Sequence, residues 1–154
     1  GYGAASVLAD YRNARPNASV EELLIALTTD HMFRIPAVRL AEVREAQGAH
    51  TWMYLFAWES RAFGGRLKAT HALEIPFTFN NLNRAGVDVF LGPGEQPQAL
   101  ADYMHQAWIA FINSGNPGWP RYTQDSRTTM VFNTQSGCVN DPAAQERAAW
   151  AGLR

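Results

Sequence analysis

The chain has 154 residues, of which 47% are hydrophobic, so it is long enough for one ordinary domain with a sizeable core. Thirteen Lys and Arg residues face fourteen Asp and Glu residues without a long run of either sign, which excludes the charge pattern of a nucleic-acid-binding or membrane-surface protein. The longest apolar run, Trp52 to Trp58, is far shorter than the roughly 20 residues that span a bilayer, so no transmembrane segment is expected and the compartment is left open.

The first third of the sequence predicts three helices whose main role is packing. A helix from about Ala4 to Ala14 ends before the next proline, which a helix interior does not accommodate. Ser19 and Glu22, three residues apart, have the form of a capping box and open a second helix. Pro36 suits the first turn of a third helix, which ends near Gly48.

The segment Thr51 to Trp58 has the pattern of a β-strand that is apolar on both faces. Trp52, Tyr54, Phe56 and Trp58 alternate with Met53, Leu55 and Ala57. Such a strand is typical of a sheet that is covered by helices on both sides, so we predict that it is buried on both faces.

The second half of the sequence predicts two more helices and a weaker strand. An amphipathic helix runs from Leu100 to Phe111 and stops at a loop rich in Asn, Gly and Pro. Thr129 to Phe132 is a candidate short strand. Asp141 and Pro142 form a suitable N-cap and first-turn pair for a last helix through Trp150.

The predicted elements underfill a sheet, because five helices accompany only one strong strand and one weak strand. An α/β domain normally alternates strands with helices and covers both faces of a sheet of several strands. We therefore predict an α/β fold that is incomplete in these 154 residues, with the other strands before residue 1.

His71 follows the predicted buried strand and a loop with two glycines, Arg61 to Gly65. In open α/β sheets, ligands bind in the crevice outside the carboxyl ends of the strands, so a histidine shortly after such a strand is well placed for chemistry. A single loop histidine is more often structural, however, and its position in the sequence leaves both roles open.

The residues around His71 resemble those of a known family. The stretch ATHALEIPFTFNNL is similar to the pattern around the catalytic histidine of type B carboxylesterases, a family that includes bacterial para-nitrobenzyl esterases and cholinesterases. That pattern reads Gly/Ala-x-His-x-x-Glu-x-x-Phe-x-Phe, and its places are taken here by Ala69, His71, Glu74, Phe77 and Phe79. The segments TWMYLFAWES, LADYMHQAWIAFINSGNP, WPRY and TTMVF resemble further family segments in the same order, so the similarity covers nearly the whole chain.

The resemblance implies that the chain is the C-terminal part of an α/β-hydrolase fold that hydrolyses carboxylic esters with a Ser-acid-His triad, without a cofactor. His71 would be the general base. Because the triad order in this fold is Ser, acid, His, both partners are expected earlier in the chain. None of the serines here lies in a Gly-x-Ser-x-Gly motif. We expect the N-terminal part of the same protein to supply both partners, and these 154 residues alone to be inactive.

Four other residues are candidates for the surroundings of the site. By the resemblance, Asp30 matches a structural position of the family, and Glu74 is expected to fix the loop by hydrogen bonds. Trp58 and Phe63 are near enough to the end of the strand to line an acyl or alcohol pocket. No metal site is expected, since neither the His71 and Glu74 pair nor Asp30 with its neighbouring histidine has a third ligand at a usual spacing.

Two alternative readings remain open at this point. The chain could be a non-catalytic fragment that associates with itself or with a partner through apolar faces that no sheet covers. It could also be a minimal hydrolase that uses His71 and Asp30 with an unrecognised serine.

Overall fold

The computed structural model describes residues 2–153, which divide into two compact units built from interleaved segments. The first unit comprises Gly1–Thr51, Tyr122–Arg127 and Asp141–Arg154, and the second comprises Trp52–Arg121 and Thr128–Asn140. Each unit has its own hydrophobic core. Among the described residues, no helix combines the length and apolar character that crossing a bilayer requires.

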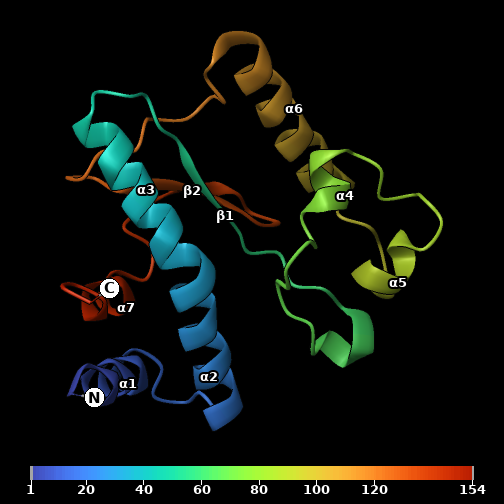
Figure 1. The fold of residues 1–154 in the computed structure, drawn as a ribbon. Coiled ribbons are helices and arrows are strands. Elements are labelled where there is room, and N and C mark those ends of the chain that lie inside the picture. Colours follow the sequence, from blue (N-terminus) through green and yellow to red (C-terminus); the bar gives the residue numbers. More distant parts are fainter. Residues whose placement is uncertain (1, 154) are drawn as a thin grey trace. The chain divides into compact units, whose positions relative to one another are not determined.

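The first unit is helical (Figure 1). Its helices are α1 (Tyr2–Ala14), α2 (Val20–Thr29), α3 (Ile35–Ala46) and α7 (Ala144–Ala149). These bounds confirm the three helices that the first third of the sequence predicts. The buried apolar side chains that join α1 to α2 are Val7, Tyr11, Leu23 and Ala26.

The start of α2 confirms the predicted capping box. The Glu22 amide donates to Ser19 Oγ at 3.1 Å, and the Ser19 amide donates to Glu22 Oε2 at 2.8 Å. The end of α2 differs from the expected break before α3, because a π-helix, Asp30–Arg34, joins the two helices. The Asp30 amide bonds to carbonyls of α2, so the hydrogen-bond ladder continues across the junction.

The predicted cap of the last helix is wrong. Helix α7 begins at Ala144, after Ala143, which has a left-handed backbone with φ of 56°. The Asp141 carboxylate instead accepts from the Arg147 side chain, with Nε at 2.7 Å and Nη2 at 2.8 Å. The Asp141 oxygens that were expected to accept from the helix backbone therefore accept from the charged Arg147 side chain, which forms stronger hydrogen bonds.

The second unit contains a three-stranded sheet in the order β1 (Met53–Phe56), β2 (Thr128–Phe132), β3 (Gly137–Asn140). The two expected strands, β1 and β2, pair in parallel, and β3 runs antiparallel to β2. Strand β3 was not predicted, because all of its residues are exposed and it lacks a buried face. A turn fixes it, in which the Asn133 amide donates to Ser136 Oγ at 3.1 Å.

The prediction that β1 is buried on both faces is wrong for these 154 residues. Tyr54 is 37% exposed and Leu55 is 39% exposed. In the part of the chain that the structure describes, β1 lies at the edge of the sheet with β2 as its only strand neighbour. Burial on both faces would need cover from chain outside the described residues.

The helices of the second unit lie after β1 in the sequence. They are a 3-10 turn (Ala62–Gly65), α4 (Ile75–Thr78), α5 (Val87–Leu91) and α6 (Gln98–Ser114). The amphipathic helix predicted from Leu100 to Phe111 is confirmed as α6, which packs into the core that also contains Met130 and Phe132. Helices α4 and α5 were missed, because one turn of helix is too short for a hydrophobic period.

Candidate active site

The chain that follows β1 returns to the carboxyl end of the strand before it reaches His71. The Ser60 amide donates to the Lys68 carbonyl at 3.0 Å, and these two residues form an antiparallel bridge. Beyond His71, the Phe77 ring lies 4.9 Å from that of Phe56, the last residue of β1. His71 thus lies between two points of attachment near the end of the strand, where open α/β sheets bind ligands.

The turn that carries His71 is held by its buried neighbours. Leu73 and Phe77 are both 0% exposed, and the Leu73 amide donates to the Thr70 carbonyl at 3.2 Å. Ala72 has a left-handed φ of 68°, which turns the chain sharply after the histidine. The His71 side chain itself is exposed. The arrangement presents an imidazole at the surface on an anchored backbone.

Ser60 anchors the loop before His71 and is no candidate nucleophile. Its side chain is buried, and Oγ donates to the Phe90 carbonyl at 2.7 Å and accepts from the Ala62 amide at 3.0 Å. At Gly92 the two segments approach so closely that a Cβ would lie 2.1 Å from the Ala62 nitrogen. The loop is therefore fixed against the end of α5.

Trp58 and Phe63, the two candidate pocket residues, line different hollows of the second unit. Trp58 is 7% exposed, lies under the Arg61 guanidinium at 5.6 Å, and borders a hollow of about 430 Å³ with Thr134. Phe63 is 70% exposed and borders a hollow of about 370 Å³ near Asp88. The structure does not bring the two aromatic rings together around one cavity.

Glu74 lies at the start of α4, where its carbonyl accepts from the amides of Phe77 at 3.0 Å and Thr78 at 2.9 Å. Residues 2–153 supply no hydrogen-bond donor to its carboxylate, so the bonds that the sequence leads us to expect are not seen there. Burial, and then the negative charge of Glu74, raise the pKa of Tyr54. The carboxylate therefore acts on β1 through its charge, while the backbone of Glu74 supports the turn.

Asp30 belongs to the first unit and is 4% exposed. Its Oδ1 accepts from Arg34 Nε at 2.6 Å, and its Oδ2 accepts from Arg34 Nη2 at 2.5 Å and from the Tyr11 hydroxyl. Both carboxylate oxygens are occupied by local partners, as in a structural ion pair. This arrangement gives no support to a minimal hydrolase in which Asp30 orients His71.

The described residues contain no group of three or more His, Cys, Asp or Glu side chains arranged to hold a metal ion. Neither His71 with Glu74 nor Asp30 with His31 has a third potential metal ligand beside it among these residues.

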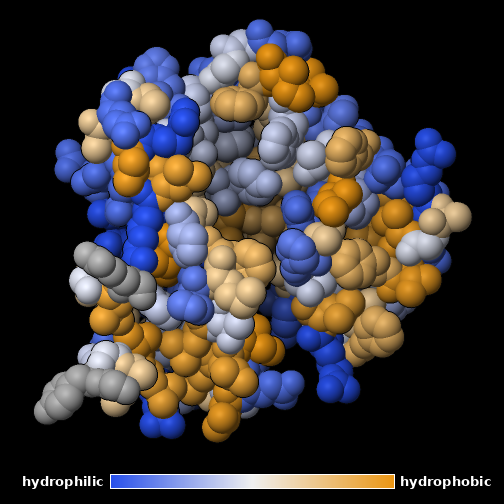
Figure 2. All heavy atoms as spheres, in the orientation of Figure 1, coloured by the Kyte–Doolittle hydropathy of each residue, from blue (hydrophilic) through white to orange (hydrophobic). Residues whose placement is uncertain are grey.

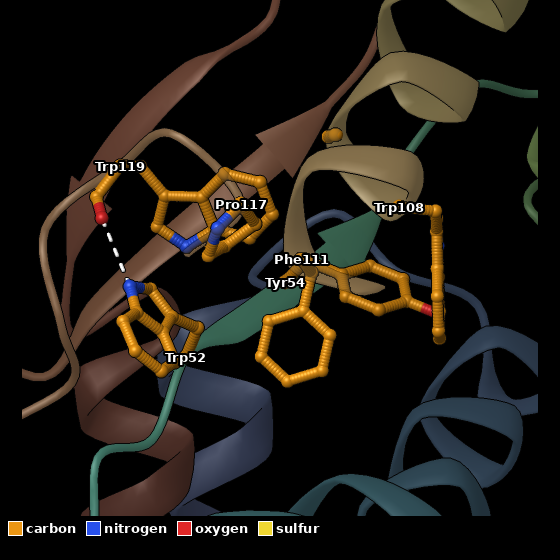
Figure 3. Close-up of a pocket in the computed structure, with 7 residues that line it drawn as sticks. Trp52, Tyr54, Trp108, Phe111, Pro117 and Trp119 are labelled. Atoms are coloured by element: carbon orange, nitrogen blue, oxygen red, sulfur yellow. Dashed lines mark hydrogen bonds between the residues drawn. The ribbon is translucent and has the colours of Figure 1, made fainter. Parts of the chain in front are cut away.

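An aromatic cavity of about 110 Å³ in the second unit was not found from the sequence (Figure 3). Two of its lining residues are joined by a hydrogen bond, in which the Trp52 indole Nε1 donates to the Trp119 carbonyl at 3.0 Å. No local pattern could have indicated this site, because its walls come from β1, the end of α6 and a loop. The residues that line it are Trp52, Tyr54, Ala107, Trp108, Phe111, Pro117 and Trp119.

Comparison with solved structures identifies the class of the fold. A carboxylesterase of Geobacillus stearothermophilus matches with a TM-score of 0.81 and 35% identity, over 95% of this chain and 31% of that chain. A para-nitrobenzyl esterase matches with a TM-score of 0.74 and 33% identity, over 85% of this chain and 27% of that chain. The chain therefore has part of an α/β-hydrolase fold, as expected.

The family follows from the sequence comparisons. The family model described as the carboxylesterase family matches residues 4–150, and the chain belongs to this family. The para-nitrobenzyl esterase of Bacillus subtilis (strain 168) is 33% identical over 131 residues, 82% of this chain and 26% of the relative. The phenmedipham hydrolase of Pseudarthrobacter oxydans is 33% identical over 119 residues, 71% of this chain and 24% of the relative. The chain spans about a quarter of the length of these relatives.

Proposed function

We propose that this chain supplies the histidine general base of a serine carboxylesterase, and that His71 is this base. The observation that carries the proposal is an exposed imidazole on an anchored turn just beyond the carboxyl end of β1, in a member of the carboxylesterase family. The edge of a sheet where parallel strands end is the usual place for such a group.

The chemistry needs a group that can both accept and return a proton near neutral pH. An imidazole takes the proton of the attacking serine as the ester carbonyl is attacked and later gives a proton to the leaving alcohol. His71 is exposed, while Leu73 and Phe77, which anchor its turn, are buried.

We further propose that residues 1–154 are the C-terminal portion of a carboxylesterase domain, with the serine and the acid supplied by the N-terminal part of the same protein. The local roles of the serines support this. Ser60 is buried against the α5 segment, Ser19 caps α2, and Ser136 closes the turn before β3. The fraction of the relatives that the chain spans is also consistent with a partial domain.

The substrate class that we propose is a small carboxylic ester, handled without a metal or cofactor. Two of the relatives are named for hydrolysis of para-nitrobenzyl esters and of phenmedipham. Protein side chains are sufficient for ester hydrolysis by a Ser-acid-His triad.

The experiment that tests this proposal is His71→Ala in the full-length protein that contains this chain, assayed on a para-nitrophenyl ester. We expect kcat to fall by about a thousandfold or more with an unchanged melting temperature, because the general base is lost while the fold is kept. His50→Ala, which removes another exposed histidine, is the matched control and should leave kcat unchanged. Wild-type activity in His71→Ala would refute the proposal. The 154-residue chain alone should show no hydrolysis.

Association is a second candidate function, supported by exposed apolar side chains. In the first unit these side chains gather at the level of α1 and α2 in Figure 2. The exposed apolar side chains of α2, the π-helix and α3 are Val20, Leu24, Ile25, Met32, Phe33, Leu40 and Val43. Large apolar patches usually mark contacts with a partner or a second copy. Light scattering that gives a monomer of the 154-residue chain at every concentration would count against this function.

A further inference from the structure

A polar cluster, formed by three side chains of α6 and by Asn80, holds the end of the short helix that follows His71. We call it the α4 clamp, and it consists of Asn80, Gln98, Asp102 and His105. The central contact joins His105 Nδ1 to the carbonyl oxygen of Thr78, the last residue of α4, at 2.8 Å. The clamp therefore acts on the element that begins four residues after His71.

The hydrogen bond between His105 and Thr78 can have only one direction. A carbonyl oxygen only accepts, so His105 Nδ1 carries the proton and donates it. The backbone donors that follow α4 go elsewhere, since the Asn80 amide donates to Phe77 and the Asn81 amide donates to Pro76. His105 thus satisfies a carbonyl of the kind that a helix end leaves without an intrahelical partner.

Two further members, Gln98 and Asp102, hold Asn80, through which the chain leaves α4. Asn80 has a left-handed φ of 49°, its Nδ2 donates to Asp102 Oδ1 at 2.9 Å, and its Oδ1 accepts from Gln98 Nε2 at 2.6 Å. Gln98 also donates to Asp102 at 2.8 Å. These bonds, with the nearby His105, lower the pKa of Asp102 and keep its carboxylate charged as an acceptor.

We propose that His105 is a positioning residue for His71, an inference that rests on the proposed role of His71 as the general base. Helix α4 has only four residues, and one turn of helix is not stable by itself. Buried Leu73 and Phe77 fix the inner side of the segment, and His105 fixes its far end to the long helix α6. Without that bond, the turn that presents the imidazole of His71 can shift relative to β1.

The test uses the full-length protein and compares His105→Phe with His105→Asn. Phenylalanine keeps a ring of similar size and removes the donor, whereas asparagine keeps an N–H group at the place of Nδ1. We expect His105→Phe to lower kcat about tenfold with KM changed less than about twofold, because misplacement of a catalytic group affects the chemical step. His105→Asn should recover kcat to within about threefold of the wild type. Gln106→Ala, an exposed neighbour, is the control with unchanged kinetics.

A second variant tests the rest of the clamp, and His105→Asn still tests His105 itself if His105→Phe does not fold. Asn80→Gly removes the two side-chain hydrogen bonds of Asn80, with Asp102 and Gln98, and leaves the bond from His105 to Thr78 in place. Glycine accepts the left-handed backbone, so kcat should fall severalfold if the clamp positions α4, and an unchanged kcat would count against the clamp. Wild-type kcat in His105→Phe, or equal losses in His105→Phe and His105→Asn, would overturn the positioning role. If His71→Ala retains full activity, the proposed function fails. An inactive His71→Ala beside a fully active His105→Phe rejects only the positioning role.

Discussion

At the scale of residues, the first unit keeps its buried charges in compensated groups. Asp30 and Glu146 are each 4% exposed, and each accepts from an arginine. Arg15 Nε lies 2.5 Å from Glu146, while the Tyr11 hydroxyl donates to Asp30 and accepts from Trp150 Nε1 at 2.8 Å. Removing one member would leave a buried charge without its partner, which is strongly destabilising.

Tyr11 provides a pH-dependent test of this group. Burial, and then its hydrogen bond to Asp30, raise the pKa of Tyr11 above its ordinary value of 10.0. The folded state therefore keeps the proton above pH 10, where the unfolded state loses it, so stability is complete below pH 10 and falls as the pH rises further. Tyr11→Phe should cost about 1–2 kcal/mol at pH 7 and flatten the decline above pH 10. Urea unfolding of the wild type and of Tyr11→Phe, at pH 7 and at a pH above 10, measures both effects.

The control for this measurement is Tyr103→Phe, because the Tyr103 side chain is 41% exposed. We expect the free energy of unfolding of Tyr103→Phe to change with pH in the same way as that of the wild type. A Tyr11→Phe protein whose decline above pH 10 runs parallel to that of the wild type would mean that this hydroxyl does not titrate with folding.

At the scale of elements, the long helices carry their own signals and the short ones do not. Helix α2 begins at a capping box that lies entirely within Ser19–Glu22. Helix α4 has no side-chain bond at its N-cap, and the carbonyl at its far end bonds to His105 of α6. Sequence patterns therefore indicate α2 directly, whereas the end of α4 is bonded by a residue of another element that no local pattern contains.

Substitution of Ser19 measures how much the local signal contributes. Ser19→Ala removes the acceptor for the Glu22 amide and should lower the free energy of unfolding by about 1 kcal/mol. Thr28→Ala is the control in the same helix, since this exposed side chain only bonds back to the Leu24 carbonyl and alanine is the better helix former. Chemical denaturation gives the free energy of unfolding of both variants. An equal decrease in the two would contradict the capping role of Ser19.

At the scale of the whole molecule, each unit is assembled from segments that are distant in sequence. The C-terminal segment, residues 141–154, brings Glu146 to Arg15 and Trp150 to Tyr11, the latter pair being 139 residues apart. The second unit has a separate core centred on Phe77, Met104 and Phe132. The first unit should therefore depend on the C-terminal segment much more than the second unit does.

Deletion of residues 141–154 tests this dependence. The first unit loses the partners of two buried or half-buried side chains, Tyr11 and Arg34, and part of its apolar cluster. We expect limited proteolysis within residues 2–51 to accelerate at least about tenfold, because local opening exposes cleavage sites. Cleavage within residues 52–121 should change little. Equal acceleration in both regions would show that the two units do not open separately.

The sequence by itself determined the features that depend on neighbouring residues. Ser19 and Glu22 are three residues apart, and the alternation of apolar residues in β1 lies within one strand, so both elements could be predicted. The position of His71 after that strand also follows from chain order, as does its resemblance to a family motif.

Only the tertiary structure decided the features that depend on distant partners. The bond from His105 to Thr78 joins residues that are 27 apart in the sequence. Asp141 does not cap the last helix, because its carboxylate accepts from Arg147. The exposure of Tyr54 depends on which strands lie beside β1. A hydrogen bond or a buried face needs both partners in place, and a local pattern holds only one of them.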